Sequence, residues 1–161
     1  MNASKKFPLK YLYLIIIVSS IIVTFASVEV LIKARNIDFY NSYIKVLKEK
    51  GVISDTFQSF LTYMVGIYFA RIAVPIGLSL NSLYAWKRDL LTKVFIGGWT
   101  IFLLGALLFS ALTLEFQSIF YYIFLVLFII LIIIVLSLAT VFRDRKHEEI
   151  KKNERNGGSK R

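Results

Sequence analysis

The sequence predicts an all-α membrane protein with four transmembrane helices in two hairpins and a short amphipathic helix in the first, outer loop. Hydrophobic residues make up 57% of its 161 residues, which excludes an ordinary soluble domain. From Val94 to Phe142 the chain is apolar except for a few hydroxyls, one glutamine and Glu115. A helix of about 20 apolar residues crosses a bilayer, so this run predicts two spans joined by a tight turn over 113–117.

The first span is predicted over 11–32, after a basic N-terminal segment, 1–10. Lys5, Lys6 and Lys10, with no acid among them, predict that the N-terminus stays in the cytoplasm. The alternative is a cleavable signal peptide with its hydrophobic region over 11–23 and a cleavage site at Ala26. The apolar run continues past Ala26, which favours an uncleaved span.

Two faces of this first span carry polar side chains. Ser20, Thr24 and Ser27 share one face, and small or hydroxyl side chains at this spacing let another helix approach closely. Glu29 falls on the opposite face near the outer end. We expect its carboxylate to reach headgroups and water there.

The outer loop, 33–56, contains a pattern typical of an amphipathic helix. Tyr40, Tyr43, Ile44 and Leu47 follow the spacing i, i+3, i+4, i+7, and lysines supply the opposite side. The pattern predicts a helix that lies on the outer membrane surface. A docking helix for an extracytoplasmic partner is the alternative, because it uses the same pattern.

The remaining spans are predicted over 57–80, 94–114 and 116–142. The second span carries Arg71 near its middle, with Pro75 one turn later. In the third span, Gly98, Gly105 and Ala106 share a face and predict a flat surface for helix packing. The fourth span is uniformly bulky and apolar, so we expect much of its perimeter to face lipid.

Basic residues predict the orientation and a contact with anionic lipid headgroups. Lysines and arginines outside the spans number three, three and eight in the N-terminus, the middle turn and the tail, against five in the outer loop. This bias predicts that both termini lie in the cytoplasm and that the chain is a multi-pass protein of the plasma membrane, with a residue usage that suggests a bacterium. The charged tail covers 143–161. The basic residues expected at lipid headgroups are Lys87, Arg88, Arg143, Arg145 and Lys146.

Arg71 is the residue whose position most needs explanation, because an arginine in mid-span costs about 2.5 to 3.5 kcal/mol on insertion scales. With a rise of about 1.5 Å per residue, Arg71 should lie roughly 4 Å to the cytoplasmic side of its span's middle. Glu29 should lie roughly 11 Å to the outer side of its own span's middle. The predicted gap of about 15 Å is too large for the two side chains to close. The depths therefore predict that the chain supplies no carboxylate for Arg71.

Three accounts of Arg71 follow from this prediction. The side chain could snorkel toward the inner headgroups. It could bind a carboxylate, carbonyl or phosphate from another subunit, which makes Arg71 and Glu29 candidates for partner or anion binding. It could also line a hydrated cavity and coordinate an anionic substrate.

Composition argues against several function classes. The chain has no cysteine, and its single histidine, His147, lies in the charged tail, so no metal site, cofactor or catalytic dyad is expected. The net charge of +10 is spread around hydrophobic spans, so we expect no nucleic-acid binding. An enzyme is not expected.

Two function classes remain. The first is a small non-enzymatic accessory or interaction subunit that binds another membrane protein or a second copy of the chain. The second is an oligomeric transport or pore-forming protein. A short multispan chain with a charged tail is similar in general plan to phage holins, without a shared motif. Four helices enclose little room, so this second class requires an oligomer.

Overall fold

The structure is a computed structural model that describes residues 7–49, 51, 57–88, 91–113 and 118–157, apart from the side chains of 113, 142 and 144–157. Within these ranges the regular secondary structure is entirely helical. The helices are α1 (Leu9–Arg35), α2 (Ile37–Glu49), α3 (Phe57–Arg88), α4 (Lys93–Thr113) and α5 (Ile119–Gly157). Four of them, all but α2, are long and apolar enough to cross a membrane, as expected of a membrane protein.

The helices differ from the predicted spans mainly at their ends. α3 continues eight residues past the predicted end at Leu80, to Arg88, and passes through Pro75 without a break. Leu78, Ser82 and Ala85 are all buried at helical spacing, and this packing holds the last turns in place. α5 continues from the apolar segment into the charged tail as one helix that ends at Gly157.

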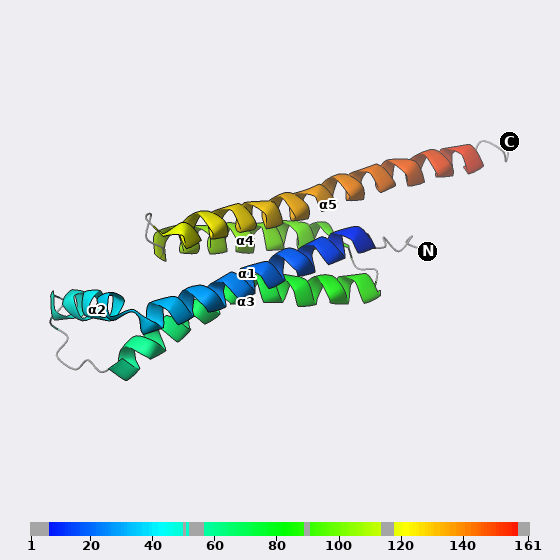
Figure 1. Cartoon of the computed structure of the whole chain (residues 1–161). Coiled ribbons are helices and arrows are strands. Elements are labelled where there is room, and N and C mark those ends of the chain that lie inside the picture. The colour runs from blue at the N-terminus through cyan, green and yellow to red at the C-terminus, as the bar shows by residue number, and fades with distance from the viewer. Residues whose placement is uncertain (1–6, 50, 52–56, 89–90, 114–117, 158–161) are drawn as a thin grey trace.

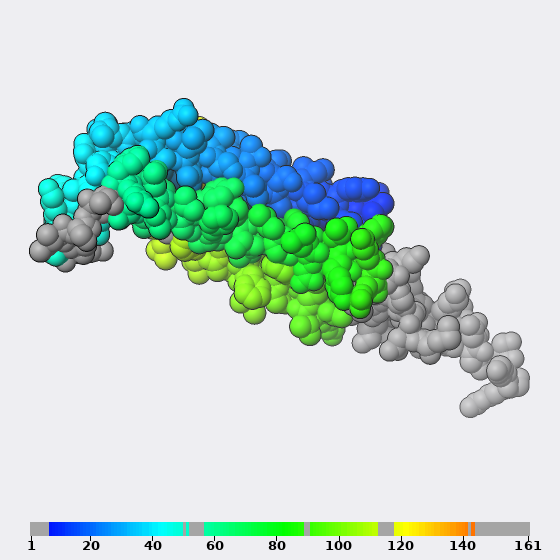
Figure 2. Space-filling view, turned by 90° about the horizontal axis from the view of Figure 1, so that it is seen from below, coloured from blue at the N-terminus to red at the C-terminus, as the bar shows by residue number. Residues whose placement is uncertain are grey.

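The helices pack as two neighbouring pairs. α1 lies along α3 and runs in the opposite direction, and α4 lies along α5 in the same way (Figure 1). α1 also contacts α5, and α3 contacts α4, so the two pairs form one bundle. On the face seen in Figure 2, α1, α3 and α4 follow one another across the surface. α2 lies at the end of the bundle where α1 finishes and α3 begins.

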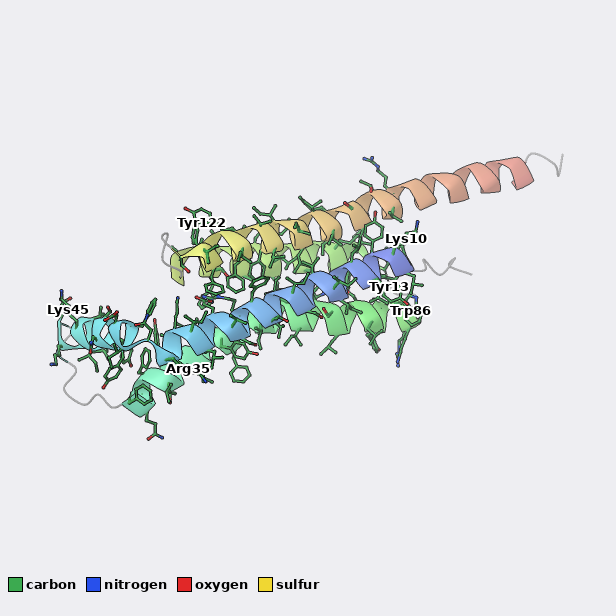
Figure 3. The ribbon with its side chains drawn as sticks, viewed as in Figure 1. Lys10, Tyr13, Arg35, Lys45, Trp86 and Tyr122 are labelled. Carbon is green, nitrogen blue, oxygen red and sulfur yellow. The ribbon has the colours of Figure 1, made fainter. Side chains whose placement is uncertain are left out.

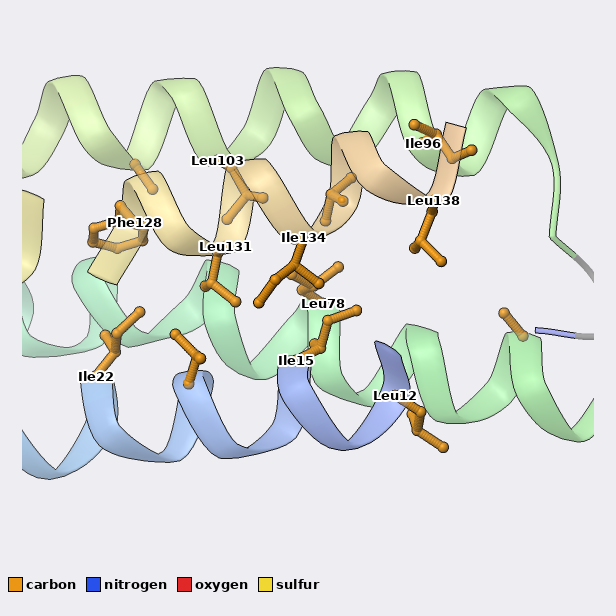
Figure 4. Close-up of a cluster of buried hydrophobic side chains, with 14 of the residues drawn as sticks. Leu12, Ile15, Ile22, Leu78, Ile96, Leu103, Phe128, Leu131, Ile134 and Leu138 are labelled. Carbon is orange, nitrogen blue, oxygen red and sulfur yellow. The ribbon is translucent and has the colours of Figure 1, made fainter. Parts of the chain in front are cut away.

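The interior of the bundle is largely apolar. α1 contributes Leu12, Ile15 and Ile22, and α5 contributes a row of aromatic and branched side chains (Figure 4). The fully buried side chains of α5 are Phe124, Phe128, Leu131, Val135 and Leu138. These residues face the other helices, while Val126, Ile129 and Ile133 on the same helix are exposed, as expected for a helix in contact with lipid.

α1 turns the face that carries Glu29 inward. Beside Val18, its buried residues recur at alternating spacings of three and four: Leu12, Ile15, Ser19, Ile22, Ala26 and Glu29. This repeat is the pattern of a helix-packing seam. Ser20, Thr24 and Ser27, which we expected to pack against a helix, are exposed, and Ser27 Oγ lies 3.2 Å from Tyr68 Oη of α3. The expectation that Glu29 reaches headgroups and water is wrong, because Glu29 is buried, with only 1% of its surface exposed.

α2 is attached to α3 by aromatic side chains. The ring of Tyr40 lies 5.5 Å from that of Phe60, and Tyr43 stacks on Tyr63 at 5.2 Å. Tyr40, Tyr43, Ile44 and Leu47 are all half-buried, whereas Lys45, Lys48 and Glu49 are exposed. A helix therefore lies where the sequence pattern placed one. Its position on a membrane surface stays a prediction.

Candidate functional site

A buried ion pair joins α1 to α3. Arg71 Nη1 donates a hydrogen bond to Glu29 Oε2, and the two residues are 2% and 1% exposed. The other carboxylate oxygen of Glu29, Oε1, lies 2.7 Å from Lys33 Nζ, one turn later on α1. Glu29 thus bridges two cations. We call these residues, Glu29, Lys33 and Arg71, the charge triad.

The prediction that the chain supplies no carboxylate for Arg71 is therefore wrong. Because α3 reaches Arg88, its middle lies between Ile72 and Ala73, and Arg71 sits about 2 Å from this middle on the side of α2. This places Arg71 roughly 6 Å closer to Glu29 than the predicted span did. The error thus came from the predicted end of the helix.

The direction of the side chains closes the remaining gap. In a helix the Cα–Cβ bonds tilt toward the N-terminus. Since α1 and α3 run in opposite directions, Glu29 leans toward the middle of the bundle and Arg71 leans toward the end where α2 lies. The two side chains therefore lean toward each other. The account in which Arg71 snorkels in the opposite direction, toward the inner headgroups, is wrong.

An aromatic ring lies against each of the two cations of the charge triad. The guanidinium carbon of Arg71 lies 4.9 Å from the centre of the Phe124 ring on α5. Lys33 Nζ lies 5.2 Å from the centre of the Phe39 ring on α2. Contacts of this kind stabilise cations that are removed from water. They also tie the charge triad to α2 and α5, which do not contribute a charge to it.

A cavity of about 210 Å³ lies against the charge triad. α1 contributes Glu29, Val30 and Lys33 to its wall, and α3 contributes Arg71. The remaining lining residues are aromatic, apolar or hydroxyl side chains of α2 and α3, namely Phe39, Ser42, Tyr43, Val46, Tyr63, Met64 and Ile67. The cavity thus combines charged side chains on one side with largely apolar walls.

The predicted small-residue face of α4 is divided between the interior and the outside. Ala106 is buried in the bundle, whereas Gly105 is exposed and Gly98 is half-buried. A Cβ atom added at Gly98 or at Gly105 would have no heavy atom within 4 Å. The bundle therefore leaves the space beside these two glycines empty.

A second cavity, of about 450 Å³, lies where the end of α3 meets the beginning of α4. Gly98 lines it together with Asn81, Tyr84, Trp99 and Phe102. Gly98 therefore belongs both to the exposed face of α4 and to a hollow between two helices. We call this hollow, with the exposed face of α4, the α3–α4 cleft.

The basic residues expected at lipid headgroups lie partly outside the described side chains. Lys87, Arg88 and Arg143 are exposed, and the guanidinium carbon of Arg88 lies 4.8 Å from the Tyr84 ring. The side chains of Arg145 and Lys146 are not among those described. Lys10 and Trp86 lie at one end of the bundle, and Arg35, Lys45 and Tyr122 lie toward the other (Figure 3).

Several buried hydroxyls do not bond to a carbonyl one turn back. Thr24 and Ser27 make this bond, to Ser20 and Val23. Ser19 Oγ and Ser110 Oγ are buried without a hydrogen-bond partner among the described residues. Their burial follows from the packing of α1 and α4, whose inward faces include these positions.

The charge triad could have been found from the sequence by its spacing. Glu29 continues the repeat of Leu12, Ile15, Ile22 and Ala26, and Arg71 lies seven residues after Met64, which is buried on α3. Two opposite charges that continue the packing repeats of adjacent antiparallel helices are candidates for a pair.

The described part of the chain has two hollows outside its packed interior, one beside the charge triad and one where α3 meets α4. Among the described residues, histidines, aspartates and glutamates do not gather in groups of three that could hold a metal ion.

Comparisons with protein-family models, with curated proteins and with solved structures gave no match for this chain.

Proposed function

We propose that this chain is a non-enzymatic accessory subunit that crosses the plasma membrane four times in two hairpins and binds a transmembrane helix of another protein at the α3–α4 cleft. Both termini lie in the cytoplasm, and α2 is an amphipathic helix on the outer surface. The lysine and arginine distribution supports this orientation.

The observation that carries the proposal is the empty space beside Gly98. Without a hydrophobic driving force between helices in lipid, close approach of backbones at small residues drives association. Gly98 and Gly105 offer this approach, and the described residues do not use it for packing within the bundle. The hollow beside Gly98 gives room for the side chains of an incoming helix.

The exposed face of α4 has the periodicity of a packing surface. Large apolar residues alternate with the two glycines at spacings of three and four: Val94, Gly98, Ile101, Gly105, Leu108 and Leu112. Val94, Ile101, Leu108 and Leu112 are between 63% and 86% exposed. Large side chains of a partner helix can enter at the glycines while these four residues pack beside them.

Affinity purification in mild detergent, followed by mass spectrometry, tests the proposal. The unchanged chain and Gly97→Leu should recover the same partner, and Gly98→Leu should lose it. Gly97 is the control, because a Cβ atom there also has open space around it but Gly97 does not line the hollow; Gly97 is exposed, whereas Gly98 is half-buried. Recovery of the same partner with Gly98→Leu would overturn the proposal.

The same purified variants distinguish the accessory function from the alternative, an oligomeric pore. Purified protein in liposomes should leave the membrane impermeable to ions and small solutes. Conductance that Gly98→Leu abolishes would replace the accessory function with an oligomeric pore. Recovery of a second copy of the chain, without another protein, would make the cleft a contact between copies.

A further inference from the structure

Asn81 places an amide in the wall of the α3–α4 cleft. It lines the hollow together with four aromatic side chains, those of Tyr84, Phe95, Trp99 and Phe102. Asn81 is exposed, and its amide makes no hydrogen bond to another described residue. Thr92 also lines the hollow, but its hydroxyl already accepts a hydrogen bond from the N–H of Phe95. The amide of Asn81 is therefore free to bond to a molecule that enters the cleft.

The two sides of the cleft lie at a similar depth in the membrane. Asn81 lies six residues before Lys87, which is in the last turn of α3, and this separation corresponds to about 9 Å. Gly98 lies five residues after Lys93, where α4 begins, or about 7.5 Å. In the proposed orientation these lysines lie at the inner headgroups. Asn81 and Gly98 then both face hydrocarbon, just inside the inner surface.

An amide at this depth restricts which helices can bind. A primary amide has two N–H donors and an acceptor oxygen. A helix that covers the cleft excludes water from Asn81, and an amide that is buried without hydrogen bonds costs free energy. A helix with only apolar side chains would bury Asn81 in this way. A polar side chain opposite Asn81 would instead satisfy the amide, as asparagine, glutamine, serine and threonine do between membrane helices.

We propose that the partner helix carries an amide or hydroxyl side chain that forms a hydrogen bond with Asn81 in the inner half of the membrane. This inference rests on the proposed function, because it concerns the same cleft, and it specifies the chemistry of the partner. Gly98 permits close approach by any helix that fits. Asn81 then selects among these helices, because those without a polar side chain at its level leave the amide unbonded.

Binding of the partner that the unchanged chain recovers tests this inference. Asn81→Leu keeps a side chain of similar size and removes the amide. It should weaken binding about three- to tenfold, measured as the partner retained when the complex is diluted in mild detergent. Asn81→Gln keeps the amide and should retain more of the partner than Asn81→Leu does. Asn41→Leu is the matched control, since it makes the same change on an exposed residue of α2 outside the cleft, and it should bind as the unchanged chain does.

The partner offers a second measurement that does not depend on how the Asn81 variants fold. Its bound transmembrane segment should contain an asparagine, glutamine, serine or threonine about five or six residues from the charged residues at its cytoplasmic end. Replacing this residue by leucine should weaken binding by a similar factor in the unchanged chain, and much less in Asn81→Leu. A double-mutant cycle gives this coupling. Additive losses, or a partner segment without such a residue, would overturn the inference.

The outcomes separate a failure of this inference from a failure of the proposed function. If Gly98→Leu loses the partner and Asn81→Leu retains it fully, the cleft binds its helix without Asn81, so the inference is overturned and the proposed function stands. An equal loss in Asn81→Leu and Asn41→Leu would also overturn the inference, because it would show a general effect of the added leucine. If Gly98→Leu retains the partner, the proposed function fails and this inference fails with it.

Discussion

The guanidinium of Arg71 donates a hydrogen bond to the carboxylate of Glu29 across the contact between α1 and α3, and both side chains are almost fully buried. An arginine in the middle of an apolar helix is thereby neutralised by its own chain. The pair also fixes how α1 and α3 slide along each other, because the hydrogen bond between Arg71 and Glu29 breaks if the register changes. A buried polar pair that selects one register is the best-attested use of such pairs.

Glu29→Gln should destabilise the bundle by about 3 to 5 kcal/mol, because it leaves Lys33 and Arg71 without the carboxylate that bridges them. Lys33→Gln should cost about 1 kcal/mol or less, since Lys33 is the triad member nearest the surface and the Glu29–Arg71 pair remains. Equilibrium unfolding in mixed micelles measures both changes. Equal costs for the two variants would contradict the central role of Glu29.

Replacing both Glu29 and Arg71 should lower the free energy of unfolding far less than replacing either one alone. In Glu29→Met with Arg71→Met, no buried charge is left at these positions, and methionine fills irregular space well. The double variant should therefore be closer in stability to the unchanged chain than either single variant. A double-mutant cycle from the same unfolding experiment gives the coupling. Additive losses would show that the two side chains do not interact.

Gly77 should tolerate substitution less than Gly66 does. A Cβ atom at Gly77 would lie 3.1 Å from Cη2 of Trp99 on α4, whereas one at Gly66 would meet nothing within 4 Å. Gly77→Val should lower stability by about 1 to 3 kcal/mol relative to Gly66→Val, because the helix preference is the same and only the Trp99 contact differs. Thermal unfolding in detergent measures both. Equal melting temperatures would place Trp99 away from Gly77.

The sequence predicted the number of apolar helices and the position of α2, because composition and periodicity determine both. It did not predict the charge triad, because a depth estimate depends on where each helix ends. The end of α3 is set by the burial of Ser82 and Ala85 against neighbouring helices, which local sequence does not reveal. The inward packing of the α1 face that carries Glu29 was missed for a similar reason. Hydroxyls suggested one packing face, whereas the bulkier repeat with Glu29 faces the bundle.

The division of the α4 glycines also depends on tertiary packing. Gly98 and Gly105 lie close together on a helical projection and Ala106 lies about 100° from Gly105, although we predicted one surface for all three. The structure buries Ala106 and leaves Gly105 exposed, because the interface with α5 falls between them. The comparison of Gly98→Leu with Gly97→Leu tests whether this face of α4 meets lipid or a partner helix.

Reporter fusions at the two termini should give the same result on both. α1 begins and α5 ends at the same end of the bundle (Figure 1). The four apolar helices, α1, α3, α4 and α5, each run along the bundle, so the chain crosses it an even number of times. A cytoplasm-active fluorescent fusion should therefore be active at each terminus, and a periplasm-active phosphatase fusion should be active in the two connections on the other side, between α1 and α3 and between α4 and α5. Opposite activities at the two termini would mean that an odd number of the four helices crosses the membrane, because each crossing moves the chain to the other side, and the four-span layout would then be wrong.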